Sequence, residues 1–115
     1  MWIHGDLHPL NLLVDEEGRL GGVVDFGDIT AGDPSYDLAV AWLALEAPER
    51  AVFTGVVDGA HHHGPATWER ARAFALSMVS LFRSVGEPGS PEEAIAVFGL
   101  RQLLGEGPAP GATGR

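Results

Sequence analysis

The sequence predicts a mostly helical α+β domain in which a loop and a β-hairpin are followed by about four helices. Residues 1–33 are rich in glycine, aspartate and β-branched residues, whereas residues 34–104 carry apolar residues at helical spacing. With 115 residues, 45% of them apolar, the chain has room for one domain with one modest core. Strands do not alternate with helices along the chain, so we do not expect a parallel sheet.

The hairpin is expected from two short apolar runs, residues 12–14 and 20–25, on either side of a turn sequence. The intervening Asp-Glu-Glu-Gly at residues 15–18 is typical of a type I turn, with glycine available for a positive φ. Gly21 and Gly22 weaken the second strand or mark a bulge in it.

Capping residues and helix breakers set the limits of the expected helices. Asp33 can act as an N-cap with Pro34 at the first helical position, and Ser90 is placed in the same way before the last helix. Gly59 is expected to stop the second, shorter helix. The predicted helices span residues 34–45, 48–57, 66–85 and 91–104.

Composition excludes several classes of protein. The net charge of −9 argues against nucleic acid or an anionic membrane as a partner, and is compatible with cationic ligands and divalent metals. There is no cysteine, which excludes disulfides and thiolate metal sites and makes a cytoplasmic location the expectation. We expect no membrane anchor, because no apolar run is long enough to span a bilayer.

Three polar side chains carry the first sign of chemistry. Asp6 and Asn11 lie five residues apart in one loop, and Asp25 ends the second strand fourteen residues later. Phosphoryl transfer needs a carboxylate beside the attacking hydroxyl and oxygen ligands that hold Mg²⁺ against the phosphates. A loop with Asp and Asn, followed by a hairpin that returns an Asp to the same place, supplies these groups.

Each of these residues also has a purely structural interpretation. A single Asp or Asn in a loop is usually a turn or cap residue, so only the joint pattern favours a kinase-like site. His4 is expected to brace the loop rather than act as acid or base. His8 stays open between contact with substrate or phosphate and simple loop structure. The histidines at 61–63 are interpreted as a loop insertion, since adjacent histidines cannot all face one ion.

Three segments together resemble the aminoglycoside phosphotransferase family, the bacterial relatives of choline kinase. They are residues 4–11 (His-Gly-Asp-Leu-His-Pro-Leu-Asn), 24–28 (Val-Asp-Phe-Gly-Asp) and 32–39 (Gly-Asp-Pro-Ser-Tyr-Asp-Leu-Ala). The resemblance implies the C-terminal lobe of a protein-kinase-like fold over residues 1–104. In that lobe, residues 1–33 form the catalytic loop and metal-binding hairpin and residues 34–104 form the helical part. Residues 105–115 are expected to be a disordered tail.

The resemblance also implies roles for individual residues. Asp6 matches the catalytic base that orients the acceptor hydroxyl, and Asn11 and Asp25 match the Mg²⁺ ligands. Asp33 and Asp37 match the family's aspartates, although capping and bracing of the catalytic loop explain them as well, and we favour that structural role. Three further residues of the matching segments are expected to support the site: His4, His8 and Asp28. We can argue no specific role for Asp28.

Members of this family transfer the γ-phosphate of ATP to a hydroxyl group of a small molecule, so ATP and Mg²⁺ are the implied co-substrate and cofactor. Kinases hold the ATP phosphates with a lysine and a Gly-rich loop on an N-terminal lobe. All seven basic residues here are arginines, and we expect that lobe to be absent from this chain or to lie on another polypeptide. Two alternatives are a catalytically inactive lobe and a metal-dependent hydrolase that uses His4, Asp6, His8 and Asp25.

Overall fold

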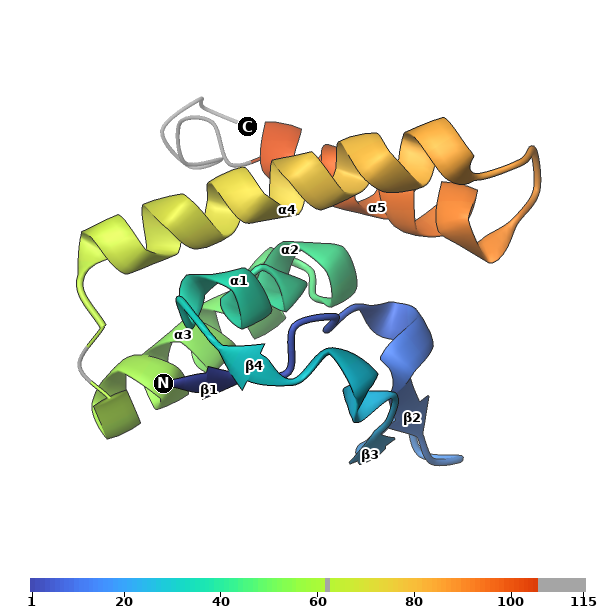
Figure 1. Cartoon of the computed structure of the whole chain (residues 1–115). Coiled ribbons are helices and arrows are strands. Elements are labelled where there is room, and N and C mark those ends of the chain that lie inside the picture. Colours follow the sequence, from blue (N-terminus) through green and yellow to red (C-terminus); the bar gives the residue numbers. More distant parts are fainter. Residues whose placement is uncertain (62, 106–115) are drawn as a thin grey trace.

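The computed structural model describes residues 1–61 and 63–105 and has the mostly helical α+β architecture that the sequence predicts (Figure 1). The expected tail at 105–115 lies outside the described residues except for Gly105. The strands are β1 (Trp2–Ile3), β2 (Leu12–Val14), β3 (Leu20–Val23) and β4 (Thr30–Ala31). The helices are α1 (Ser35–Leu38), α2 (Val40–Ala44), α3 (Ala47–His61), α4 (Pro65–Val85) and α5 (Pro91–Leu104), with short 3-10 turns at Pro9–Asn11 and Phe26–Asp28.

The described strands pair into two small antiparallel sheets. Strands β2 and β3 form the predicted hairpin, and its register shifts between Leu13, opposite Gly22, and Val14, opposite Leu20. Gly21 is therefore the extra residue of a bulge, as its position in the strand suggested. The second sheet, β1 with β4, was not predicted, because two residues per strand are too few to show a pattern.

Two of the helix predictions were wrong in their limits. The expected helix 34–45 is divided into α1 and α2 around Ala39, and the expected helix 48–57 runs on as α3 through Gly55 and Gly59 to His61. A glycine costs about 1 kcal/mol in a helix, which the neighbouring turns of α3 outweigh. Helices α4 and α5 begin and end within one residue of the prediction.

The core lies where α4 and α5 run side by side over α1 and α2 (Figure 1). Small residues allow this close packing: a Cβ at Gly99 of α5 would come within 2.7 Å of Val79 on α4 and 3.2 Å of Leu43 on α2. The helices thus form a rigid base, and the loop between β1 and β2 and the hairpin lie against one side of it (Figure 1). The buried apolar residues of this core are Ala39, Ala41, Trp42, Leu43, Ala71, Ala75, Met78, Val79, Ile95, Ala96 and Leu103.

Candidate active site

The loop at residues 4–11 brings Asp6 and Asn11 together. A 3-10 turn at Pro9–Asn11 reverses the chain, and His8 caps the turn by accepting the backbone N–H of Leu10 at its Nδ1 (3.3 Å). The Nδ2 group of Asn11 then donates to the backbone oxygen of Asp6 (2.7 Å) and to Asp6 Oδ2 (3.2 Å). Asn11 is 7% exposed, whereas the side chain of Asp6 is 38% exposed. The carboxylate of Asp6 is thus both held by the loop and open to an incoming molecule.

His4 braces this loop through both nitrogens of its ring. Its Nδ1 accepts the backbone N–H of Asp6 (3.1 Å), so the ring proton sits on Nε2, which donates to the backbone oxygen of Val24 (2.8 Å). The ring also packs on Phe26, with 4.7 Å between centroids. Because both ring nitrogens of this buried histidine are engaged, His4 is suited to bracing and not to metal binding or proton transfer.

Asp37 holds the same loop from α1. Its two carboxylate oxygens accept the backbone N–H groups of His4 (2.6 Å) and Gly5 (3.0 Å). Gly5 has a φ of +87°, and a Cβ there would clash with the backbone oxygen of Asp28, so only glycine fits between the two segments. Asp37 therefore contributes to the site through the backbone of the loop at residues 4–11.

Asp33 caps the helix that carries Asp37. Its Oδ1 accepts the backbone N–H of Ser35 (3.0 Å), and its Oδ2 accepts from Arg70 Nε of α4 (2.9 Å). The Ser35 N–H, followed by the Arg70 guanidinium, lowers the pKa of Asp33 from 3.8 to about 2. The cap was predicted, but the contact with Arg70, 37 residues further along the chain, gave no signal in the sequence.

The predicted second strand, residues 20–25, was too long: β3 ends at Val23, and Asp25 lies two residues beyond it with an unusual backbone. Its φ of 60° and ψ of 64° place it in the left-handed region, alone among the non-glycine residues of the described ranges 1–61 and 63–105. Asp tolerates this conformation better than most residues, yet such geometry is concentrated at functional sites. The backbone N–H of Val24 donates to the oxygen of Asn11 (2.9 Å), so Asp25 directly follows a residue bonded to Asn11.

Asp28 is exposed, and its carboxylate has no hydrogen bond or ion pair to another described residue. It borders a hollow of about 350 Å³ with Asp33, Tyr36 and Phe74. Its backbone oxygen faces Gly5, so the backbone of Asp28, rather than its carboxylate, shapes the loop.

Asn11 and Asp25 each offer a side-chain oxygen, the kind of donor that Mg²⁺ prefers. Within residues 1–61 and 63–105, no three His, Cys, Asp or Glu side chains are grouped as ligands of one ion. Mg²⁺ is usually held by one or two protein oxygens together with water and substrate phosphates. Asn11 turns its Nδ2 to Asp6, which leaves its Oδ1 directed away from these bonds. The hydrolase alternative loses support, since it requires His4 as a ligand.

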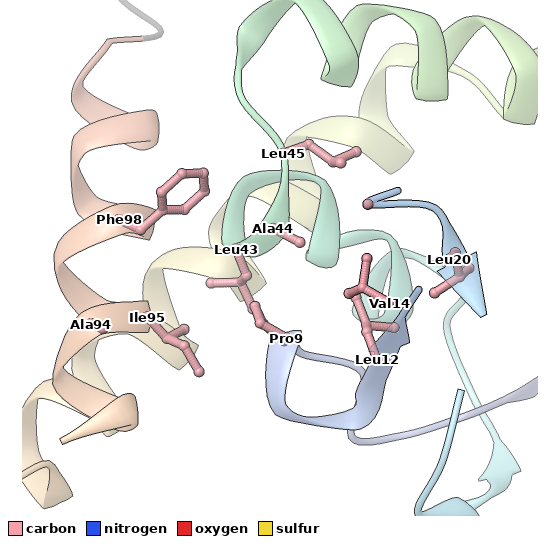
Figure 2. A pocket seen from close by; sticks show the side chains of 11 residues that line it. Pro9, Leu12, Val14, Leu20, Leu43, Ala44, Leu45, Ala94, Ile95 and Phe98 are labelled. Atoms are coloured by element: carbon pink, nitrogen blue, oxygen red, sulfur yellow. The ribbon is translucent and has the colours of Figure 1, made fainter. Parts of the chain in front are cut away.

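A larger, apolar hollow of about 680 Å³ is lined by other residues, among them Pro9 of the same loop (Figure 2). The hairpin contributes Leu12, Val14 and Leu20 to its wall, and α2 and α5 contribute Leu43 and Phe98 among others. Asp6, Asn11 and Asp25 do not line it. Several of its residues, including Val14 and Leu20, are exposed, so the hairpin presents an apolar face without cover from the described part of the chain.

The comparison with known protein families tests the family resemblance that the sequence motifs carry. The model of the phosphotransferase enzyme family matches residues 1–74, which contain the whole loop at residues 4–11, the hairpin, α1 and α2. This chain belongs to the phosphotransferase enzyme family. The match confirms the resemblance to aminoglycoside phosphotransferases that the sequence motifs carry.

Comparisons with individual proteins and with solved structures give less information about this chain. Part of the chain is 42% identical over 38 residues to the uncharacterized protein YcbJ of Bacillus subtilis (strain 168), a stretch that covers 33% of this chain and 12% of that relative. The chain thus matches only about an eighth of the length of this relative. No solved structure matches the chain. None of the described helices has the length and apolar character needed to cross a membrane.

Proposed function

We propose that this chain is the catalytic lobe of a small-molecule phosphotransferase that moves the γ-phosphate of ATP to a hydroxyl group. The observation that carries the proposal is the hydrogen-bonded unit of Asp6 and Asn11, in a chain whose first 74 residues match the phosphotransferase enzyme family. On this proposal residues 1–104 form the C-terminal lobe of a protein-kinase-like fold, with the loop and hairpin as its catalytic part.

Each site residue has a distinct task in this proposal. Asp6 accepts the proton of the acceptor hydroxyl and orients its oxygen toward the phosphorus atom. The oxygens of Asn11 and Asp25 hold Mg²⁺, which when bound neutralises charge on the phosphates. His4 and Asp37 keep the loop in place through the bonds described above, so that the distance between base and metal ligands is fixed.

The acceptor is a small molecule with a hydroxyl group, and the net charge of −9 favours a cationic one such as an amino sugar or an amino alcohol.

The alternative is that the chain is a catalytically inactive lobe. The basic side chains of the chain favour this alternative. There is no lysine to hold the ATP phosphates. Most of the described arginines already have partners in the protein: Arg19 binds Asp15, Arg50 binds backbone oxygens of Ala41 and Leu45, Arg70 binds Asp33, Arg72 binds the oxygen of Leu103, and Arg83 binds Glu93. We therefore expect the isolated chain to show no useful turnover, and phosphate-binding groups would have to come from a further lobe.

A segment exchange tests the proposal. Residues 1–104 replace the corresponding lobe of a phosphotransferase whose acceptor is known, and ATP consumption is measured for the chimera, its parent and the isolated chain. We expect the chimera to retain turnover and Asp6→Asn to reduce kcat by about 10²–10⁴-fold. Asp28→Asn, in the same loop region as Asp25, is the matched control and should change kcat little.

The chimera also separates the two candidate functions. Loss of turnover in Asp6→Asn and Asp25→Asn, but not in Asp28→Asn, supports the phosphotransferase. A folded chimera without turnover, or one whose turnover survives Asp6→Asn, overturns the proposal and leaves the inactive lobe.

A further inference from the structure

We propose that His8 is a positioning residue for Asp6: it holds one oxygen of the Asp6 carboxylate so that the other lone pairs face the acceptor hydroxyl. This inference rests on the proposed function, because it assigns His8 a part in the reaction of Asp6. Its basis is a set of contacts around His8 that extends from the catalytic loop to α4.

The hydrogen bonds of His8 define which of its nitrogens carries the proton. Nδ1 accepts the backbone N–H of Leu10 (3.3 Å), so in the neutral ring the proton is on Nε2. Nε2 lies 3.3 Å from Asp6 Oδ1, an ion-pair distance, and in this tautomer Nε2 carries the ring proton. The Nδ2 group of Asn11, 3.5 Å from Nε2, is a second donor and therefore makes no hydrogen bond to the ring in this state.

The two oxygens of the Asp6 carboxylate thus have separate partners. Nε2 of His8 lies 3.3 Å from Oδ1, and Nδ2 of Asn11 donates to Oδ2 at 3.2 Å. Polar contacts at both oxygens restrict rotation of the carboxylate more than a contact at one oxygen would. A carboxylate accepts about four hydrogen bonds, so lone pairs remain for the proton of a substrate.

Packing prevents the His8 ring from turning away. Its side chain is only 12% exposed, and the edge of its ring meets Phe82 of α4, with 5.1 Å between centroids and an 80° angle. Phe82 in turn packs against the helical core. Through His8, the orientation of the Asp6 carboxylate therefore depends on α4, a helix distant in the sequence. A residue that only capped the turn at residues 9–11 would not need this contact.

The competing explanation is that His8 serves only to cap the 3-10 turn through Leu10. Two substitutions separate these roles, because an Asn oxygen occupies roughly the place of Nδ1 and a Gln nitrogen that of Nε2. His8→Asn keeps the acceptor for Leu10 and loses the donor to Asp6. His8→Gln can keep the donor to Asp6.

The first readout does not depend on activity: the ¹³Cγ resonance of Asp6 in the isotope-labelled chain. We expect it to move in His8→Asn and to stay near its wild-type position in His8→Gln. His61→Asn, an exposed histidine at the end of α3, is the matched control and should leave Asp6 unchanged. An Asp6 resonance that is unmoved in His8→Asn, or that moves equally in both His8 variants, overturns the inference.

The second readout is kcat of the chimera described above. Positioning predicts that kcat falls at least 10-fold in His8→Asn, with KM nearly constant, and is largely restored in His8→Gln. Equal kcat values in both variants contradict positioning. If the Asp6 resonance behaves as expected but the wild-type chimera has no turnover, His8 still holds Asp6 and only the proposed function fails.

Discussion

Replacement of Asp33 tests the link between the helical base and the catalytic loop. Asp33 accepts the Ser35 N–H and the Arg70 guanidinium, which lower its pKa from 3.8 to about 2. At about 1.4 kcal/mol per pKa unit, this shift corresponds to at most about 2.5 kcal/mol of stability. The carboxylate is 36% exposed, so solvent screening reduces this figure to about 1 kcal/mol.

Two variants separate the cap from the charge. Asp33→Asn keeps an oxygen for the Ser35 N–H and should lose only the charge, about 1 kcal/mol at pH 7. Asp33→Ala loses the cap as well, and should lose about 1–2 kcal/mol. The measurement is urea denaturation followed by circular dichroism, with Arg70→Gln and the double variant closing the cycle for the ion pair.

The pH dependence has a definite sign. A carboxyl whose folded pKa lies below its unfolded pKa stabilises the fold above the unfolded value, here 3.8, and loses that contribution as the pH falls toward 2. The difference between wild type and Asp33→Asn should therefore be constant from pH 7 to 5 and shrink between pH 5 and 2. A difference that does not change with pH, or an Asp33→Ala variant as stable as wild type, would refute the reasoning.

Three further changes test other parts of the account. Asp37→Asn should cost about 1.5–3 kcal/mol in urea denaturation, because its NH₂ group would face one of the two loop N–H groups; no loss would mean that Asp37 does not brace the loop. Asp25→Gly should be about 1 kcal/mol more stable than Asp25→Ala, since φ is 60° there, and the reverse order would contradict that backbone. The exposed apolar hairpin should make the chain self-associate in sedimentation velocity, and Leu20→Glu should reduce this more than Val56→Glu, at an exposed position of α3; a monomer at all concentrations would contradict it.

Much of the site could be predicted from sequence because its signals are local. The spacing of Asp6 and Asn11, the turn before Gly18 and the cap at Ser90 each act over a few residues, and the structure has the loop, hairpin and helix that they predict. The position of Asp25, shortly after the second strand of the hairpin, was also predictable, because the hairpin is a local structure.

The rest depends on contacts between distant segments. Three such contacts are the pairing of β1 with β4, the bond from Arg70 to Asp33 and the packing of Phe82 on His8. Each joins residues about 28 to 74 positions apart, and no periodic pattern in the sequence indicates them. Gly59 was misread as a helix end because a glycine that costs about 1 kcal/mol does not stop a helix already extended on both sides.

The most direct test of the central claim, that Asn11 and Asp25 form a metal site beside Asp6, is a titration with Mn²⁺ followed by NMR. Mn²⁺ prefers the same oxygen ligands as Mg²⁺ and broadens nearby resonances. The account predicts that the side-chain amide of Asn11 and the backbone amides next to Asp25 broaden first, and that Asp25→Asn removes the effect. Broadening that begins instead at the acidic turn of residues 15–17, with Asn11 unaffected, would contradict it.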